Sequence, residues 1–224
     1  MKEGGSSMID FHSHILPQMD DGSTSVQMSH AMLQMQHQQG ISGVIATPHF
    51  YATQDDPESF LKRRQAAVKA LGQTEIPLIC GAEVAYFEGM GRCDALSKLC
   101  IGQTDLLLLE MPFAPWDTRM IGEVEELSAS SGVVPVIAHI DRYRLQIRKW
   151  GDDLLSRGVL FQCNATAFLQ MGSRGWALKQ LAMDRVRFLG SDCHNITTRK
   201  PNLAAAAEVI RKKLGEHPIL TEEF

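Results

Sequence analysis

Short, nearly continuous apolar runs alternate along this chain with longer segments that repeat apolar residues at helical spacing. The runs at 106–109 and 133–137 do not alternate with polar side chains. Such runs are typical of parallel strands that helices cover on both faces. Seven strands are predicted, over residues 8–14, 43–47, 77–82, 105–111, 133–138, 159–163 and 186–191.

The segments between the predicted strands have the apolar spacing of amphipathic helices. Asp55 or Asp56, directly before Pro57, has the character of a helix start. Seven strand–helix alternations in 224 residues predict one α/β domain over 8–224, built as a (β/α) barrel-like fold. A doubly wound open sheet is the alternative. Residues 1–7, which include two glycines and two serines, are expected to be a flexible leader or an expression remnant.

Composition excludes several classes of protein. The 22 Lys and Arg residues against 26 Asp and Glu give a net charge of -4, which argues against a generally basic nucleic-acid surface. No apolar run reaches the roughly 18 residues of a membrane span, and the first residues lack the apolar segment of a secretory signal. The 5 cysteines have no CxxC spacing, so a reducing, cytoplasmic location is expected rather than a disulfide framework.

Residues able to bind metal are concentrated at the ends of the predicted strands. Six of the seven strands end in, or are soon followed by, such residues, namely His12, His14, His49, Glu83, Glu110, His139, Asp192 and His194. The carboxyl ends of parallel strands form one edge, so these side chains are expected to meet there. A mixture of imidazoles and carboxylates suits Zn, Mn or Fe better than Ca.

Local spacing strengthens the prediction of a metal site. His12 and His14 are two residues apart on one strand, so both can face the same cation. Asp20 or Asp21, in a turn after that strand, offers a further carboxylate. Any one of these residues alone could be a satisfied buried histidine, a cap or a turn former. Their shared position at one edge favours a metal centre over eight separate structural roles.

A series of motifs resembles those of the PHP (polymerase and histidinol phosphatase) superfamily, and more narrowly its bacterial protein-tyrosine phosphatase branch of the CpsB/YwqE type. The motifs are DFHSHILP at 10–17, DDG at 20–22, ATPH at 46–49, GAE at 81–83, AHIDR at 138–142 and SDCHN at 191–195. They cover almost the whole chain and occur in the family's order. One departure is Gln18, where the family often has glycine.

The resemblance implies a three-metal centre in a distorted seven-stranded barrel, with Mn as the first expectation and Fe, Zn or Mg as alternatives. By position, the first metal would have the ligands His12, His14, Glu83 and Asp192. Glu83 would bridge to a second metal held by Glu110 and His139. The third would have the ligands Asp21, His49 and His194. Arg142 and Arg199 match the family's phosphate-binding arginines.

The function implied is hydrolysis of phosphotyrosine on proteins by metal-activated water, with a bacterial tyrosine kinase of capsule or exopolysaccharide synthesis as the expected substrate. One alternative is a small-molecule phosphatase of the same superfamily, such as the histidinol-phosphate type. Another is a cysteine-dependent phosphatase, because Cys193 and Arg199 have the C-x5-R spacing of such enzymes. A metal-binding module without turnover is a third. The sequence does not predict an oligomeric state.

Overall fold

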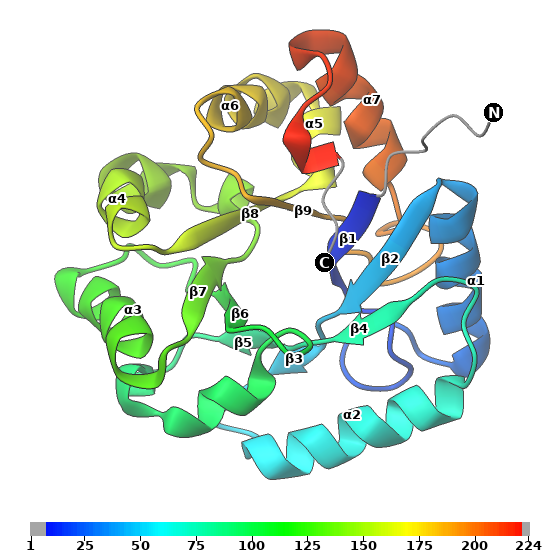
Figure 1. Ribbon diagram of the computed structural model, residues 1–224, viewed down its shortest axis with the longest axis horizontal. Coiled ribbons are helices and arrows are strands. Elements are labelled where there is room, and N and C mark those ends of the chain that lie inside the picture. The colour runs from blue at the N-terminus through cyan, green and yellow to red at the C-terminus, as the bar shows by residue number, and fades with distance from the viewer. Residues whose placement is uncertain (1–7, 221–224) are drawn as a thin grey trace.

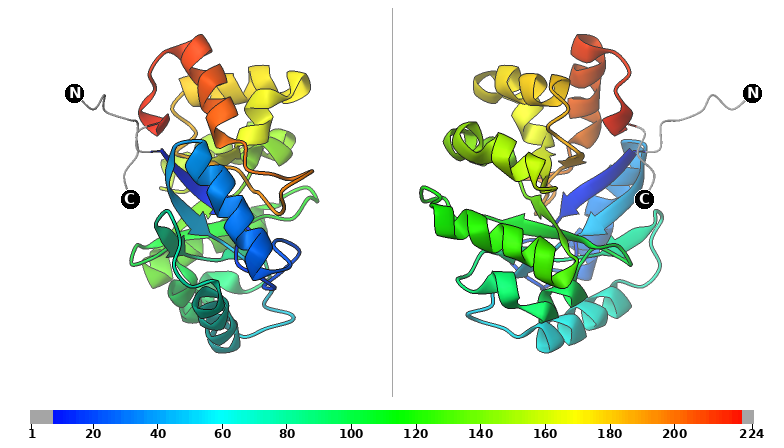
Figure 2. Two further views of the ribbon diagram at one scale, coloured as in Figure 1. Left: turned by 90° about the vertical axis from the view of Figure 1, so that its right-hand side faces the viewer. Right: turned by 60° about the vertical axis from the view of Figure 1, so that its left-hand side comes forward.

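The computed structural model describes residues 8–220, apart from the side chain of Ser130. The expected leader at 1–7 lies outside the described residues, as do 221–224. Helices surround a central group of strands in Figure 1, and the two side views in Figure 2 show the strands running through the middle of the molecule. No helix in the described part of the chain is both long and apolar enough to cross a bilayer.

The described strands form two parallel sheets. One sheet has the order β1-β2-β4 and the other the order β3-β5-β6-β7-β8-β9. The described strands are β1 (Met8–Ser13), β2 (Ile41–Ala46), β3 (His49–Phe50), β4 (Leu78–Cys80), β5 (Glu83–Ala85), β6 (Leu106–Glu110), β7 (Val134–Ile137), β8 (Leu160–Asn164) and β9 (Phe188–Gly190).

Each of the seven predicted segments overlaps a strand, but β3 and β5 are additional. They follow β2 and β4 after short breaks, and Pro48, which has no N–H to donate, lies in the first break. The two short strands pair with each other, with His49 opposite Glu83. Two residues expected just beyond strands therefore begin new strands, and these place them side by side.

The strand order brings the end of the chain back to its beginning. The amide of Asp192, just after β9, donates to the carbonyl of His12 at 2.8 Å, and Ser13 forms a parallel bridge with Cys193. The strands are thus a curled parallel arrangement in which β9 lies beside β1. This differs from the doubly wound open sheet considered as the alternative.

The helices cover the outside of the strands (Figure 1). They are α1 (Val26–Gln38), α2 (Pro57–Leu71), α3 (Thr118–Ser131), α4 (Arg144–Ser156), α5 (Ala165–Leu169), α6 (Met171–Ala182) and α7 (Leu203–Leu214), with short 3-10 turns at Met90–Arg92, Asp94–Leu99, Ile140–Arg142 and Pro218–Leu220. The predicted start of α2 is confirmed, because the Asp56 carboxylate accepts from the amides of Glu58 and Ser59, each at 3.0 Å.

Apolar side chains pack on both faces of the strands. In β6, Leu107 and Leu109 belong to the large core that includes the helices, whereas Leu108 belongs to a smaller cluster. That smaller cluster includes Phe11 and Phe188, whose rings stack at 3.8 Å. Burial of both faces explains why these runs lack polar alternation.

Candidate metal centre

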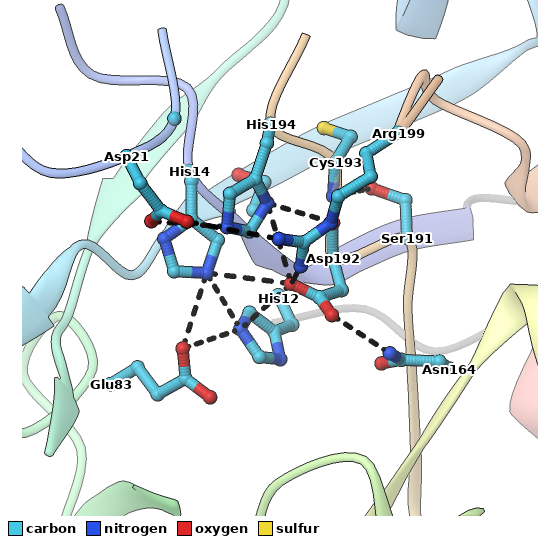
Figure 3. A network of polar contacts seen from close by, with 12 residues as sticks. His12, His14, Asp21, Glu83, Asn164, Ser191, Asp192, Cys193, His194 and Arg199 are labelled. Carbon is cyan, nitrogen blue, oxygen red and sulfur yellow. Dashed lines mark hydrogen bonds and ion pairs between the residues drawn. The ribbon is translucent and has the colours of Figure 1, made fainter. Parts of the chain in front are cut away.

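The structure brings all nine predicted ligands to one place, at the carboxyl ends of the strands. Three overlapping groups have ligand atoms that all lie within 4.8 Å of one another. Their members are His14, Asp21, His49 and His194; His12, His14 and Glu83; and His49, Glu83 and Glu110. Figure 3 shows several of these side chains directed toward a common centre. The overlap means that neighbouring cations could share ligands.

Glu83 lies at the middle of the centre. Its Oε2 is 3.2 Å from Nε2 of His12 and 3.2 Å from Nε2 of His14. Oδ1 of Asp192 lies 3.7 and 3.5 Å from the same two nitrogens. These four residues are the set that the family resemblance assigns to the first metal. All four are buried, so they offer a closed group of nitrogen and oxygen donors.

The other carboxylate oxygen of Glu83 faces a second group. Oε1 lies 2.8 Å from Nε2 of His139, and Oε1 of Glu110 lies 3.5 Å from that nitrogen. Glu83 therefore presents one oxygen to each of two groups, as a bridging ligand must. Nδ1 of His49 lies 3.2 Å from Oε2 of Glu83, the oxygen that also faces His12 and His14, and 3.9 Å from Oε2 of Glu110.

Asp21 completes the third group, and its neighbour Asp20 has a different position. Oδ1 of Asp21 lies 3.6 Å from Nε2 of His49 and 3.4 Å from Nε2 of His194. The Asp21 side chain is 65% exposed, whereas that of Asp20 is 5% exposed. Asp20 instead pairs with the outer nitrogen of His14 at 2.7 Å and accepts from the amides of His49 at 2.9 Å and Gly22 at 2.9 Å.

The donor set fits metal ions, as judged by buried nitrogens that have no hydrogen bond. Among the described residues, Nδ1 of His49 and Nε2 of His194 are buried without a hydrogen-bond partner. Nε2 of His12 lies only 3.1 Å from Nε2 of His14. Buried polar atoms are ordinarily paired, so an inward-facing group of unpaired imidazole nitrogens and carboxylates indicates a cation site.

The imidazoles in this group have divergent pKa values. Burial lowers the pKa of His14, but hydrogen bonds to Asp20 and Glu83 outweigh burial and raise it to about 10. Burial also lowers the pKa of His139, but hydrogen bonds to Glu110 and Glu83 outweigh burial and raise it to about 9. In contrast, burial and the charge of His14 lower the pKa of His194 to about 4. Some of these rings therefore carry a proton that a metal must displace.

The two predicted phosphate-binding arginines lie at the edge of the centre. Nη2 of Arg199 lies 2.8 Å from Oδ1 of Asp192, and Arg142 contacts the other oxygen of Asp192. Both guanidiniums are partly exposed. Each can thus contact the centre through Asp192 and still present N–H groups to a ligand. A planar guanidinium matches two phosphate oxygens.

Backbone in the left-handed region places two predicted ligands. Asp192 has a φ of 52° and His139 a φ of 33°, backbone angles that residues other than glycine rarely adopt. Gln18, which stands where the family often has glycine, has a φ of 58°. Its amide donates to the carbonyl of Ser23 at 2.7 Å and closes the turn that carries Asp20 and Asp21. The turn therefore forms despite the departure from glycine.

The sixth predicted strand supplies no predicted ligand, but two of its residues support the candidate ligands, a role that the sequence did not predict. On β8, Oε1 of Gln162 accepts from the amide of His139 at 2.6 Å and lies 3.2 Å from Nδ1 of His12. With a proton on Nδ1, His12 keeps Nε2 free for a metal. Asn164, two residues on, donates to Asp192 at 2.9 Å. Polar residues two apart in a buried strand were the signal.

Asp10 is a second residue whose role the sequence analysis missed. Its fully buried carboxylate accepts hydrogen bonds from the amides of His12 at 3.3 Å and Ser191 at 2.7 Å, and from the side chains of Ser191 and Gln36. Asp10 thereby ties β1 to the segment after β9. Asp10 is the first residue of the motif at 10–17, but the sequence does not reveal which backbone amides its carboxylate meets.

Comparison with known protein families gives a match over nearly the same residues that the structure describes. Residues 8–221 match the family model described as "Capsular polysaccharide synthesis, CpsB/CapC". The chain belongs to the CpsB/CapC family. Tyrosine-protein phosphatase YwqE of Bacillus subtilis (strain 168) is 29% identical to it over 96% of this chain and 89% of YwqE. Tyrosine-protein phosphatase CpsB of Streptococcus pneumoniae is 29% identical over 93% of this chain and 91% of CpsB.

A solved structure shares the fold of this CpsB/CapC family member. It comes from a crystallographic description of YwqE from B. subtilis and CpsB from S. pneumoniae as metal-dependent tyrosine phosphatases. It superposes with a TM-score of 0.75 at 26% identity and covers 93% of this chain and 88% of the other. The resemblance inferred from the sequence motifs is thereby confirmed.

The competing cysteine mechanism does not fit this CpsB/CapC structure. Cys193 is fully buried, and burial raises the pKa of its thiol well above the usual range. A cysteine nucleophile needs a lowered pKa and access to substrate. In Figure 3 the sulfur of Cys193 lies apart from the labelled imidazole rings, and the side-chain amide of Gln36 donates to it at 3.8 Å. The C-x5-R spacing of Cys193 and Arg199 is therefore no catalytic signature here.

Proposed function

We propose that this chain is a metal-dependent protein-tyrosine phosphatase. The observation that carries the proposal is the group of nine histidines and carboxylates, which lies directly beside two partly exposed arginines in a chain of the CpsB/CapC family. Hydrolysis of a phosphate ester needs an activated water and cations that neutralise the phosphoryl oxygens. The relatives YwqE and CpsB are tyrosine-protein phosphatases, which gives the substrate class.

Three divalent cations are proposed, with Mn as the first candidate and Fe, Zn or Mg as alternatives. His12, His14, Glu83 and Asp192 would hold the first cation. Glu83, Glu110 and His139 would hold the second, and Asp21, His49 and His194 the third. Divalent cations bound here would lower the pKa of a bound water toward neutrality and withdraw charge from the phosphoryl group. Asp20 and Gln162 would hold the outer nitrogens of His14 and His12.

Arg142 and Arg199 are proposed to bind the phosphoryl oxygens and hold the phosphorus beside the ligand group. Both already contact Asp192, so each guanidinium is positioned within one side chain of the proposed first metal. The leaving phenolate of phosphotyrosine has a parent pKa of roughly 10, so its departure needs little proton donation. The chain therefore has to supply orientation and charge more than a strong general acid.

The finer biological context is also a proposal. The expected substrate is a tyrosine-phosphorylated protein, in the first place a bacterial tyrosine kinase that controls capsule or exopolysaccharide synthesis. We place the enzyme in the cytoplasm, where its 5 free cysteines would stay reduced. We further propose that residues 8–224 fold as one domain and that the strands at the seven predicted positions form a distorted barrel.

The decisive experiment compares substrates on protein with defined metal content. Protein treated with chelator and reloaded with Mn is expected to hydrolyse a phosphotyrosine peptide far faster than histidinol phosphate, and to lose activity again on chelation. The double variant His12→Ala with His14→Ala should lose most activity and at least one equivalent of metal by elemental analysis. A strong preference for histidinol phosphate would favour the small-molecule phosphatase. Unchanged phosphate release in the double variant would indicate a contaminating enzyme.

A further inference from the structure

A cavity of about 610 Å³ opens beside Asp192. Its wall includes Arg142, Arg199 and Asp192 on one side, and residues of α4, α5 and the first turn of α6 on the other. The volume lies within the range of about 300–1,000 Å³ that is usual for ligand pockets. Because the two arginines border both the cavity and the metal centre, a group that extends from a bound phosphoryl ester can enter this cavity.

The cavity wall carries more positive than negative charge, although the whole chain has a net charge of -4. Four cationic side chains line it, namely Arg142, Arg144, Arg199 and Lys200, against Asp141 and Asp192. Asp192 already contacts Arg142 and Arg199, and Asp141 accepts from the amide of Asn164 at 2.9 Å. Within residues 8–220, neither Arg144 nor Lys200 has an ion pair with a carboxylate.

Arg144 is held in place by neutral groups. Its Nε donates to the carbonyl of Asp141 at 3.2 Å and its Nη1 to the carbonyl of Gly172 at 2.9 Å. The guanidinium lies 5.5 Å from the centre of the Trp176 ring. These contacts fix the charge without neutralising it, and they leave Nη2 without a hydrogen bond to any described residue. A fixed cation with unused donors is suited to bind an anionic group.

The cavity on the other side of the centre has the opposite character. It measures about 580 Å³ and is lined by Asp20, Asp21 and Asp55, with Arg63 as its single cationic residue among the described lining side chains. Arg63 pairs with Asp55 at 2.6 Å, so its charge is already compensated. For an acidic group beside the phosphoryl ester, the first cavity thus offers two cations without a carboxylate partner, whereas the described lining of the second offers none.

We propose that the cavity beside Arg144 is a subsite for an acidic side chain, aspartate or glutamate, that neighbours the phosphotyrosine in the protein substrate. Arg144 and Lys200 are the cations that contact this carboxylate, while Arg142 and Arg199 stay with the phosphoryl group. The inference rests on the proposed phosphatase activity and adds a sequence preference to it. Small aryl phosphates, which carry no carboxylate, would not use the subsite.

The test uses pairs of phosphotyrosine peptides that differ only in aspartate or asparagine on either side of the tyrosine. For the Mn-loaded enzyme, the acidic peptide should have a kcat/KM about tenfold higher, mainly through KM. Lys200→Gln and Arg144→Gln should each remove much of this preference and leave p-nitrophenyl phosphate turnover unchanged. Lys200→Glu should instead favour a peptide in which lysine replaces the aspartate.

Arg148→Gln is the matched control, because Arg148 is an exposed residue of α4 that does not line the proposed subsite; it lines a neighbouring cavity, which Arg144 also borders. This variant makes the same charge change and should keep the acidic preference. Equal kcat/KM for the two peptides in the unmodified enzyme would overturn the subsite, as would an equal effect of Arg148→Gln, which indicates long-range attraction. Thermal melting of Arg144→Gln checks that loss of the Trp176 contact has not unfolded it.

A binding measurement separates this inference from the proposed activity. The same peptide pairs, made with a non-hydrolysable phosphonate in place of the phosphate ester, are titrated by fluorescence polarisation. Tighter binding of the acidic peptide supports the subsite even if no peptide is hydrolysed, in which case the phosphatase proposal alone fails. Equal affinities would overturn the subsite whatever the turnover.

Discussion

Oδ2 of Asp20 lies 2.7 Å from Nδ1 of His14 and also accepts the amide hydrogen of His49 at 2.9 Å. One buried carboxylate therefore contacts the ring of one candidate ligand and the backbone amide of another. Burial raises the pKa of Asp20, but the contact with His14 outweighs burial and lowers it to about 2. The carboxylate is thus ionised at neutral pH, where it can hold the outer N–H of His14 and leave the inner nitrogen for a metal.

Replacing Asp20 should therefore weaken metal binding with little change in the ligands themselves. We expect Asp20→Asn to lower metal affinity or activity by roughly 10–100-fold, the range found for residues that orient metal-binding histidines. Isothermal titration of chelated protein with Mn measures the affinity. Asp55→Asn, which changes an acid outside the ligand set, serves as the control. Unchanged Mn affinity in Asp20→Asn would refute the orienting role.

Metal binding should release protons, because two candidate ligands hold them tightly. The pKa of His14 is raised to about 10 and that of His139 to about 9, against a usual value of 6.5. At pH 8 both rings are mostly protonated before a metal binds, so binding must displace at least one proton. Titrations in buffers of different ionisation enthalpy measure this number. A heat of binding independent of the buffer would contradict the prediction.

The same shifts predict how pH affects the stability of chelated protein. A histidine whose pKa is raised on folding stabilises the fold fully below the unfolded value of 6.5 and loses this contribution as pH rises through the folded value. The melting temperature of chelated protein should therefore fall between about pH 6.5 and 10, because His14 and His139 deprotonate. Mn-loaded protein, whose rings cannot bind protons at the metal-ligating nitrogens, should show a smaller fall. Equal pH profiles for the two forms would argue against the shifts.

Cys193 should be dispensable for catalysis. Cys193→Ser is expected to keep kcat/KM within about threefold of the unmodified enzyme, because the buried thiol lies apart from the labelled imidazole rings in Figure 3. The variant should lose about 1–3 kcal/mol of stability, since a hydroxyl replaces a thiol in a buried position. Activity assays with and without chelator, together with thermal melting, measure both effects. Activity that survives chelation and is lost in Cys193→Ser would restore the cysteine mechanism.

The close approach of β9 to β1 should be sensitive to a single methyl group. A Cβ built on Gly190 would lie 2.5 Å from Cβ of His12 and 3.0 Å from its backbone nitrogen. Gly190→Ala must therefore push the two strands apart, at a cost of roughly 1–3 kcal/mol. It should also weaken metal binding, because His12 and Asp192 lie on these two segments.

Gly175→Ala provides the matched control for Gly190→Ala. Gly175 lies inside α6, and a Cβ there would meet nothing within 4 Å. Alanine has the higher helix propensity, so this variant should gain up to about 1 kcal/mol. Chemical denaturation and Mn titration of both variants measure the contrast. Similar stabilities for the two variants would show that the β9–β1 contact accommodates an added methyl group more easily than the structure suggests.

Much of the fold and of the ligand set could be predicted from local sequence. The non-alternating run at 106–109 predicted a strand buried on both faces, and β6 is packed in that way. His12 and His14 could be assigned to one site because residues two apart on a strand face the same side. The chemistry of imidazoles and carboxylates at strand ends then predicted a metal centre, since the ends of parallel strands share an edge.

Relations between distant segments could not be predicted in this way. Asp20 and Asp21 are equivalent in sequence, but the turn through Gln18 buries one carboxylate and leaves the other exposed to face His49 and His194. Gln162 and Asp10 became supporting residues only because β8 and β9 pack against the histidines. Local sequence determines residue chemistry and strand periodicity, whereas the curled packing of the strands decides which donors, acceptors and charges meet. Those meetings depend on backbone positions far apart along the chain, and neither spacing nor composition encodes them directly.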